Sequence, residues 1–244
     1  MKTKALFCWS GGKDSAMALY QVMQEGEYEV AYLLTTINEN FKRISMHGVR
    51  EEMLEKQVEA IGIPLIKMYV KEGNNDEYEQ NMEKILLGLK KEGIEYVIFG
   101  DIFLEDLRRY REKNMDKAGM KTVFPLWKKN TAALMKSFFS LKFKTITCCV
   151  NDAWLNEEQT GAEVDAAFVR DLPPEVDPCG ENGEFHTFCF DGPLFKHPVL
   201  FSTGEKVYRP LEVKTDNTVC HSDNKTKGFW FCDLIPLKDG TKTV

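Results

Sequence analysis

Short apolar runs alternate with helical patterns through the first 150 residues of the chain. The runs have the length of strands and lie at 5–9, 30–34, 65–70, 96–100 and 145–150. Between them, apolar residues recur at helical spacing, in sets such as Leu54, Val58 and Ile61. Continuous apolar strands joined by helices are typical of a parallel sheet that is buried on both faces. The pattern therefore predicts an α/β domain over residues 1–150, built on a doubly wound parallel sheet of five strands.

The pattern changes near residue 151. Prolines cluster within 171–178, and the strand-like pieces 184–190 and 229–235 replace the alternation of strand and helix. We therefore expect a second, smaller α+β domain over residues 151–244. In an open parallel sheet, ligands bind beyond the carboxyl ends of the strands, so the first domain should hold its ligand at that edge.

The composition, 43% hydrophobic and 29% charged, is that of a folded globular protein. A net charge of -6 counts against a protein that holds nucleic acid by its phosphates, because that task needs a basic surface. No apolar run is long enough to span a bilayer, and the first apolar stretch is too short for a secretory signal. We therefore expect a cytoplasmic protein without a membrane partner.

The cysteines are odd in number, and no two of them stand at the two-residue gap of zinc and redox motifs. They are Cys8, Cys148, Cys149, Cys179, Cys189, Cys220 and Cys232. Reduced, mostly buried thiols are the expectation. The tightest metal-like group is Cys179, His186 and Cys189, but no fourth ligand has a suitable spacing, so a zinc site is disfavoured.

The segment SGGKDS directly follows the first predicted strand and directly precedes a helix. At such a junction, backbone N–H groups and the helix dipole favour an anion. The segment combines hydroxyl donors, glycines that let the backbone approach a phosphate, a cation and a carboxylate: Ser10, Ser15, Gly11, Gly12, Lys13 and Asp14. Lys13 can neutralise charge on a departing pyrophosphate, and Asp14 can cap the helix or bind a Mg²⁺ ion on the phosphates. The alternative is a plain turn with a capping aspartate.

A Walker loop would need glycine at position 7 and serine or threonine at position 14, where this chain has Phe7 and Asp14. The segment instead resembles the SGGxDS signature of the PP-loop ATP pyrophosphatases. The resemblance implies that ATP is cleaved between its α and β phosphates. A substrate oxygen would be adenylated, pyrophosphate would leave, and a nucleophile would then open the adenylate.

A second polar segment, GENGEFHT (180–187), lies between the proline-rich stretch and an apolar strand. It offers two carboxylates, an amide, an imidazole, a hydroxyl and a glycine turn: Glu181, Glu184, Asn182, His186, Thr187 and Gly183. If a strand begins at Glu184, then Glu184 and His186 lie on one face of it. A carboxylate beside an imidazole suits proton removal from attacking ammonia. The alternative is a surface hairpin with Asn-Gly as its turn.

Together with 100–112 and 124–127, the segment 179–195 resembles the diphthine–ammonia ligase family, and the resemblance covers nearly the whole chain. It implies an amide-forming ligase that adenylates a carboxylate or amide oxygen and transfers ammonia to it. Ligases of this family that use diphthine typically carry GEGGEYET or GEGGEFET, whereas Asn182 and His186 stand here, as in a bacterial branch. We therefore expect ATP use with a different, unidentified acceptor. Free ammonia is the expected donor, because Lys2 stands where a glutaminase would need cysteine.

The resemblance also implies roles for residues of the first domain. Thr36, at the end of the second predicted strand, and His47 would lie near the adenosine. Gly100 and Asp101 end the fourth predicted strand, where Asp101 could bind Mg²⁺ or the acceptor, and Arg108 could meet a phosphate or an acidic acceptor. The alternatives are a capping or solvated histidine, a capping aspartate and an exposed charged helix face.

Two other functions fit a PP-loop protein. A tRNA thiolase would show paired active-site cysteines and a basic face, but Cys148 and Cys149 are adjacent on a predicted strand and cannot both point to one face. A non-enzymatic protein that only holds ATP or AMP is the other alternative, and release of pyrophosphate would exclude it. The sequence leaves the oligomeric state open, with a homodimer among the options.

Overall fold

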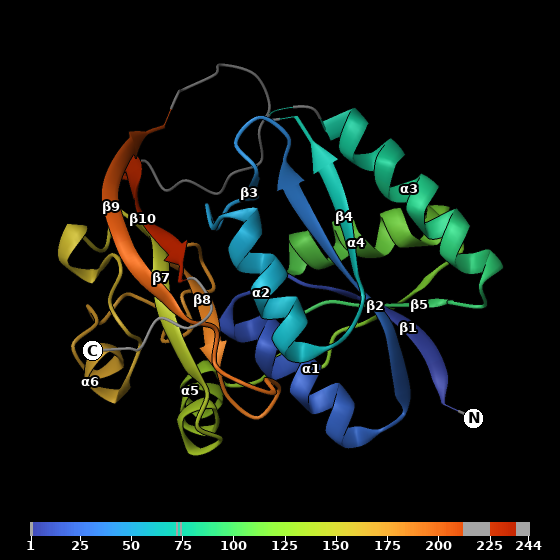
Figure 1. Ribbon diagram of the computed structural model, residues 1–244, viewed down its shortest axis with the longest axis horizontal. Helices are drawn as coiled ribbons and strands as arrows, with labels where there is room; N and C mark the ends of the chain where they lie inside the picture. Colours follow the sequence, from blue (N-terminus) through green and yellow to red (C-terminus); the bar gives the residue numbers. More distant parts are fainter. Residues whose placement is uncertain (1, 72, 74, 212–224, 238–244) are drawn as a thin grey trace.

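The computed structural model describes residues 2–71, 73, 75–211 and 225–237, so Cys220 lies outside the described residues. Two sheets lie side by side (Figure 1). One is mostly parallel with helices on both faces, and the other has four antiparallel strands. The predicted class, an α/β sheet domain with a smaller C-terminal domain, is confirmed.

The larger sheet has the strand order β3-β2-β1-β5-β6, with β4 also paired to β2. The strands are β1 (Thr3–Cys8), β2 (Tyr28–Asn38), β3 (Arg43–Ile44), β4 (Leu65–Val70), β5 (Tyr96–Ile98) and β6 (Lys121–Val123). All pairs are parallel except β2 with the two-residue β3. Five strands thus run parallel, as predicted, but the fifth is the short β6 and not the predicted run 145–150.

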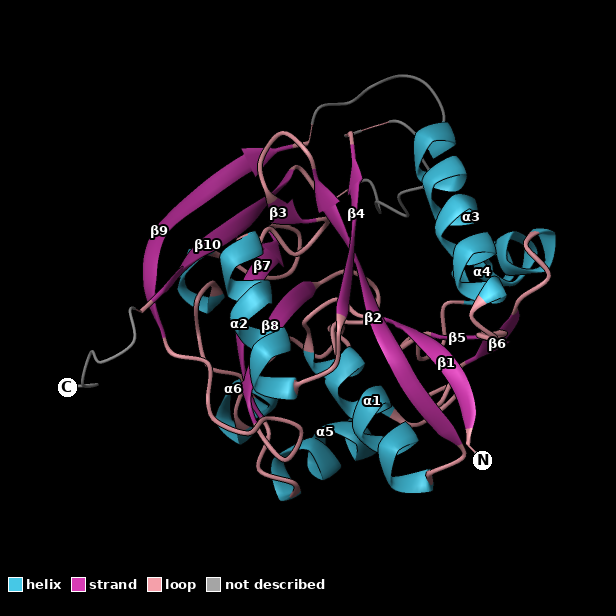
Figure 2. Ribbon diagram, turned by 45° about the vertical axis from the view of Figure 1, so that its right-hand side comes forward, coloured by secondary structure: helices cyan, strands magenta, loops and turns pink. Residues whose placement is uncertain are grey.

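The helices that cover the larger sheet are α1 (Lys13–Glu25), α2 (Glu51–Ile61), α3 (Asn75–Lys91) and α4 (Glu105–Lys117). Successive residues of β1 point to opposite faces, so Phe7 joins the apolar cluster under α1 and α2 while Leu6 joins the cluster under α3 and α4. Figure 2 shows α1 and α2 on one side of the sheet and α3 and α4 on the other. This two-sided burial explains why the strands are continuously apolar.

The second sheet has the order β8-β7-β10-β9 and contains the run 145–150. Its strands are β7 (Lys144–Asn151), β8 (Phe185–Asp191), β9 (Phe201–Pro210) and β10 (Gly228–Pro236), accompanied by α5 (Thr131–Ser140), a 3₁₀ turn (Glu157–Gln159) and α6 (Ala166–Arg170). The prediction that β7 belongs to the parallel sheet is wrong. As a central strand with both faces covered, β7 is as continuously apolar as a parallel strand.

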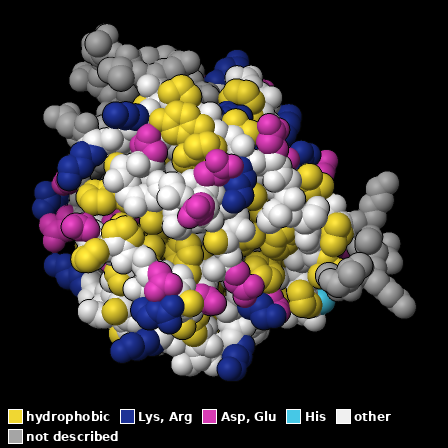
Figure 3. Space-filling view, turned by 90° about the vertical axis from the view of Figure 1, so that its left-hand side faces the viewer, with side chains coloured by type: hydrophobic (Ala, Val, Ile, Leu, Met, Phe, Trp, Pro, Cys, Tyr) yellow, Lys and Arg dark blue, Asp and Glu magenta, His cyan; other side chains and the backbone are white. Residues whose placement is uncertain are grey.

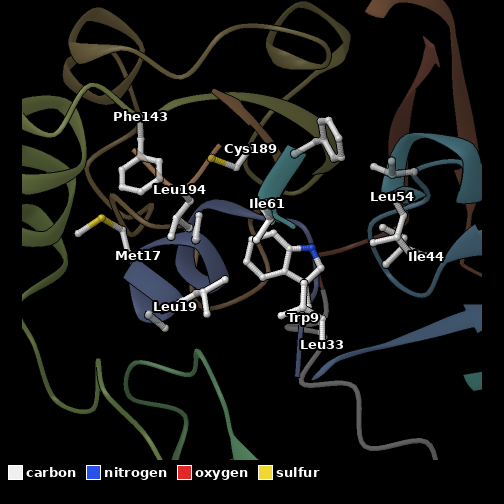
Figure 4. Close-up of a cluster of buried hydrophobic side chains, with 14 of the residues drawn as sticks. Trp9, Met17, Leu19, Leu33, Ile44, Leu54, Ile61, Phe143, Cys189 and Leu194 are labelled. Carbon is white, nitrogen blue, oxygen red and sulfur yellow. The ribbon is translucent and has the colours of Figure 1, made fainter. Parts of the chain in front are cut away.

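One apolar cluster joins the two sheets. It contains Trp9 and Leu19 from the first region together with Phe143, Cys189 and Leu194 from the second (Figure 4). Because this shared apolar surface is buried, the loop after β1 packs against β8. The two polar segments singled out in the sequence therefore meet.

Candidate active site

The PP-loop, residues 10–15, turns from β1 into α1 with two glycines at its centre. Gly11 has φ +82°, a left-handed conformation that favours glycine. A Cβ on Gly12 would lie 3.0 Å from His47 Cε1 and 3.1 Å from the Thr187 carbonyl oxygen. The hydroxyl oxygens of Ser10 and Ser15 lie 2.5 Å apart and form a hydrogen bond across the loop. The loop is thus closed by its own hydroxyls and seated directly on the C-terminal segment.

Lys13, the first residue of α1, is only 2% exposed. Its ammonium donates to Asp14 Oδ2 at 2.8 Å and to the Cys179 carbonyl, and it lies 5.3 Å from the centre of the Phe185 ring. Burial lowers the pKa of Lys13, but Asp14, together with Cys179 and Glu181, more than offsets this, so the pKa lies above its ordinary value. Lys13 therefore stays charged inside the site.

Asp14 is the candidate for a magnesium ion. Burial raises the pKa of its carboxyl group, against the opposing effect of Lys13. Its side chain is 30% exposed beside the PP-loop, and one carboxylate together with substrate phosphates is a common donor set for Mg²⁺. The residue therefore fits the ion. Among the described residues, no group of three or more metal-binding side chains gathers, and Cys179, His186 and Cys189 do not form one.

Glu181 ties the C-terminal segment to the edge of the parallel sheet. Its Oε1 accepts from the backbone N–H groups of Ile102 at 2.8 Å and Phe103 at 3.4 Å, just after β5. Burial, followed by the charge of Asp14, raises the pKa of Glu181 to about 8. The carboxyl group therefore carries a proton at neutral pH.

Glu184 takes a different position from the one expected. β8 begins one residue later, at Phe185. The Glu184 carboxylate, 1% exposed, accepts from the backbone N–H groups of Asp177 and Asn182 at 3.0 and 2.9 Å, and from Asn182 Nδ2 at 3.1 Å. Its bonds shape the turn, in which Gly183 has φ +85°, and do not reach His186. A catalytic role for Glu184, alone or together with His186, stays a prediction.

The partner of His186 is His47, from the loop between β3 and α2. The two rings lie 4.9 Å apart. Nδ1 of His47 lies 3.0 Å from the Thr187 carbonyl oxygen, which can only accept, so Nδ1 carries the proton and Nε2 has the free lone pair. Thr187 also accepts from the backbone N–H of Lys13 at 3.1 Å through its hydroxyl. The imidazole pair and the PP-loop thus share one neighbour.

Both imidazoles are neutral at physiological pH. Burial, assisted by the charge of Lys13, lowers the pKa of His47 to about 4, although its bond to Thr187 acts in the opposite direction. Burial lowers the pKa of His186 to about 3, with His47 and Lys13 contributing. A neutral imidazole can accept a hydrogen bond from a substrate N–H, whereas pKa values this low make both rings weak bases.

The loop that carries His47 is fastened to β10. Asp233 accepts from Arg43 Nη1 at 2.9 Å and from Arg50 Nη2 at 2.6 Å. A Cβ on Gly48, where φ is +70°, would lie 2.6 Å from the Phe231 ring. No motif in the sequence points to Asp233, because its two partners are more than 180 residues away.

Gly100 and Thr36, also predicted for the site, contact the segments that carry the PP-loop and His47. Gly100 packs on the start of α1, since a Cβ there would lie 3.2 Å from the Ser15 backbone nitrogen. The Thr36 carbonyl accepts from Ser45 N–H at 3.1 Å, which connects β2 to the His47 loop. Their contacts with a nucleotide stay predictions.

Asp101 and Arg108 are engaged with other side chains. Asp101 Oδ2 lies 2.6 Å from Nε of Arg111, whose guanidinium covers the Phe99 ring at 4.5 Å. Arg108 pairs with Glu112 at 2.7 Å and lies over the rings of Phe124 and Trp127 at 4.8 and 4.6 Å. A cavity of about 200 Å³ opens near Phe99 and Arg111, between α3 and α4. Asp14 and Asp101 each pair with a cation, and a magnesium role for Asp101 stays a prediction.

Six cysteines within the described residues carry free thiols, and most are buried. Burial raises the pKa of Cys8 to about 12, and it raises the pKa of Cys148 and Cys149 as well. These thiols are protonated at neutral pH and are poor nucleophiles. None of the described helices is long and apolar enough to cross a membrane.

Comparisons with known proteins identify the family of the chain. Residues 1–122 match the family model described as the diphthamide synthase N-terminal domain, and residues 130–217 match the diphthamide synthase C-terminal domain. The diphthine–ammonia ligase of Mus musculus is 28% identical over 231 residues, 85% of each chain. That of Homo sapiens is 26% identical over 230 residues, again 85% of each, and that of Danio rerio is 26% identical over 259 residues, 96% of this chain and 95% of the relative. The chain therefore belongs to the diphthamide synthase family, whose relatives here are diphthine–ammonia ligases.

Proposed function

We propose that the protein is a ligase that cleaves ATP to AMP and pyrophosphate and transfers ammonia to an adenylated acceptor. The observation that carries the proposal is the meeting of two motifs 174 residues apart, where the Lys13 backbone N–H donates to the Thr187 hydroxyl at 3.1 Å. The loop 10–15 and the polar segment GENGEFHT are thus in contact, which supports a single site that includes both. The family membership supports the same class of reaction.

In the first step, a carboxylate or amide oxygen of the acceptor attacks the α phosphorus of ATP. The bond from that phosphorus to the α,β-bridging oxygen breaks, and pyrophosphate leaves. The N-terminus of α1 and the backbone of Gly11 and Gly12 hold the phosphates. Lys13, charged and within reach, stabilises the negative charge on the leaving group. Mg²⁺, held by Asp14, would add further charge neutralisation on the phosphates.

In the second step, ammonia attacks the carbon that is bonded to the adenylated oxygen. The bond between that carbon and oxygen breaks, AMP leaves, and the nitrogen gives up one proton. The free lone pair of His47 Nε2 and the neutral ring of His186 are the hydrogen-bond acceptors we assign to this N–H group; because burial and Lys13 keep both pKa values low, the proton passes on to water. Lys13 lies close enough to lower the pKa of both rings, and its charge disfavours an ammonium cation at the same place. Neutral ammonia is therefore the proposed donor. The protonated Glu181 can donate a hydrogen bond to the acceptor.

The proposed acceptor differs from diphthine. The part of the site that faces His47 carries the imidazole of His186, where the resemblance leads us to expect a carboxylate. A neutral ring in this position changes both the charge and the hydrogen bonding offered to the acceptor. Asn182, exposed on the turn, adds an amide side chain to the same segment where diphthine-using ligases typically carry glycine.

The test is to incubate the protein with Mg²⁺, ATP, ammonium chloride and a panel of carboxylic acids and amides, and to quantify nucleotides and pyrophosphate. AMP and pyrophosphate should form in equal amounts with the true acceptor, and Lys13→Ala should abolish both. Lys129→Ala, an exposed lysine outside the loop, is the control. Formation of ADP would refute the mechanism, and AMP formation that depends on a diphthine-bearing protein would refute the different acceptor.

A tRNA thiolase is disfavoured. Cys148 and Cys149 are buried in β7, and burial raises the pKa of each thiol, so neither supplies a thiolate at neutral pH. On the face shown in Figure 3, acidic and basic side chains are interspersed, whereas tRNA binding requires a basic patch.

A further inference from the structure

Gln57 is a polar side chain buried in the apolar cluster beneath the PP-loop. It lies in α2 and is 0% exposed. Its amide Nε2 donates to the carbonyl oxygens of Gly11 at 2.9 Å and Cys189 at 2.6 Å, while its Oε1 accepts from the Trp9 indole N–H at 2.8 Å. Figure 4 shows Trp9 and Cys189 in this apolar cluster. One side chain thus links β1, the PP-loop and β8.

The hydrogen bond from Gln57 to the Gly11 carbonyl restrains the backbone of the PP-loop. The Gly11 carbonyl also accepts from the Cys189 backbone N–H at 2.8 Å, so it is held from two directions. In a planar trans peptide, the carbonyl and the following N–H point in opposite directions. Fixing the Gly11 carbonyl therefore fixes the Gly12 N–H on the opposite side, where it lies 3.3 Å from the Ser10 hydroxyl. There the Gly12 N–H donates to the Ser10 hydroxyl, so the restraint extends to the hydroxyl pair of Ser10 and Ser15.

Close packing strengthens this restraint. A Cβ on Gly11 would lie 2.9 Å from Gln57 Oε1, so the amide and the loop backbone are in contact and neither can rotate freely. Both donors of the Gln57 amide are used. The bond to Cys189 connects the same amide to the strand that carries His186.

We infer that Gln57 is a positioning residue for the reaction, which holds the Gly12 N–H and its partner, the Ser10 hydroxyl, in place for an ATP phosphate and keeps the loop in register with β8. The inference rests on the proposed function, because it assumes that the loop binds a nucleotide. A residue that only stabilises the fold would have no selective effect on phosphate recognition. Selectivity for phosphate therefore separates the two roles.

The experiment compares two ligands, α,β-methylene-ATP with Mg²⁺ and adenosine, by calorimetric titration of the full chain. Gln57→Glu keeps the shape of the side chain but removes both donors to carbonyl oxygens. It should weaken the binding of the triphosphate analogue roughly tenfold or more, the scale of one or two lost hydrogen bonds. Adenosine, which lacks phosphates, should bind with unchanged affinity. Gln24→Glu, the same substitution at an exposed position of α1, should leave both affinities unchanged.

Trp9→Phe provides a second variant if Gln57→Glu does not fold. It removes the indole N–H from Gln57 Oε1, together with part of the buried ring, leaves both Gln57 donors in place, and should weaken the analogue selectively, by a smaller factor. Unchanged analogue affinity in the variants, or an equal loss for adenosine and the analogue, would overturn the positioning role. Failure of the wild-type protein to bind the analogue would instead overturn the proposed function and this inference with it.

Discussion

Replacing Asp233 with asparagine should lower the free energy of unfolding by about 2 kcal/mol, the typical worth of hydrogen bonds to a charged group. The carboxylate accepts two bonds from Arg50, at 2.8 and 2.6 Å, and one from Arg43 at 2.9 Å. Loss of one partner from a fully buried pair would cost more, about 3–5 kcal/mol. The side chains of Asp233 and Arg50 are 17% and 38% exposed, so water screens the pair and the smaller figure applies.

Thermal unfolding measures this cost. For a chain of this length, 2 kcal/mol corresponds to a fall in melting temperature of about 4–8 °C. The matched control is Asp171→Asn, because Asp171 forms a 2.8 Å ion pair with Arg170 on the exposed surface and should contribute nothing measurable. If the two variants melt at the same temperature, the Asp233 clamp does not hold the His47 loop as the structure indicates.

The same clamp predicts a pH dependence. Hydrogen bonds from Arg50 lower the pKa of Asp233, and burial opposes them only in part. The folded pKa therefore lies below the unfolded value of about 3.9, so the unfolded state binds more protons in acid. The stabilisation is present above that value and is lost as the pH falls through the folded pKa. The difference between wild type and Asp233→Asn, measured by urea unfolding, should be full at pH 7 and shrink below about pH 4.

Two further substitutions probe the contacts of the PP-loop and the imidazole pair. Gly12→Ala should destabilise the protein by about 1–3 kcal/mol in urea unfolding, because its Cβ would crowd His47 and the Thr187 carbonyl. Gly88→Ala in α3, where a Cβ meets nothing within 4 Å, should be neutral or stabilising, and equal effects would contradict the crowding. His186→Glu should raise the pKa of His47 from about 4, since a carboxylate beside the ring favours its charged form. An NMR titration in which His47 keeps its wild-type pKa would show that the two side chains do not interact.

Local patterns in the sequence were enough to predict much of the fold. The apolar runs that became β1, β2, β4 and β5 are confirmed, and so are the pieces that became β8 and β10. These runs are readable because a buried strand must be apolar wherever it lies. The three-residue β6 is too short to show such a pattern, and the exposed β9 has no continuous apolar face.

The position of β7 could not be inferred in this way. A strand covered on both faces has the same apolar sequence in a parallel sheet and in the middle of an antiparallel one, and its partners are chosen by packing. The sequence likewise located the PP-loop, because glycines and a lysine between a strand and a helix are a local signal.

The composition of the site depended on contacts between distant segments. His47 and His186 are 139 positions apart in the chain, and the Gln57 amide joins two segments that are far from it in sequence. Hydrophobic periodicity shows which face of an element is buried but not which element covers it. The sequence by itself therefore determined most of the strands, the main helical pattern and the position of the glycine- and lysine-containing loop, where the signal is local. Only the packing of the two sheets on one shared core chose the neighbours of that loop, and with them the chemistry of the site.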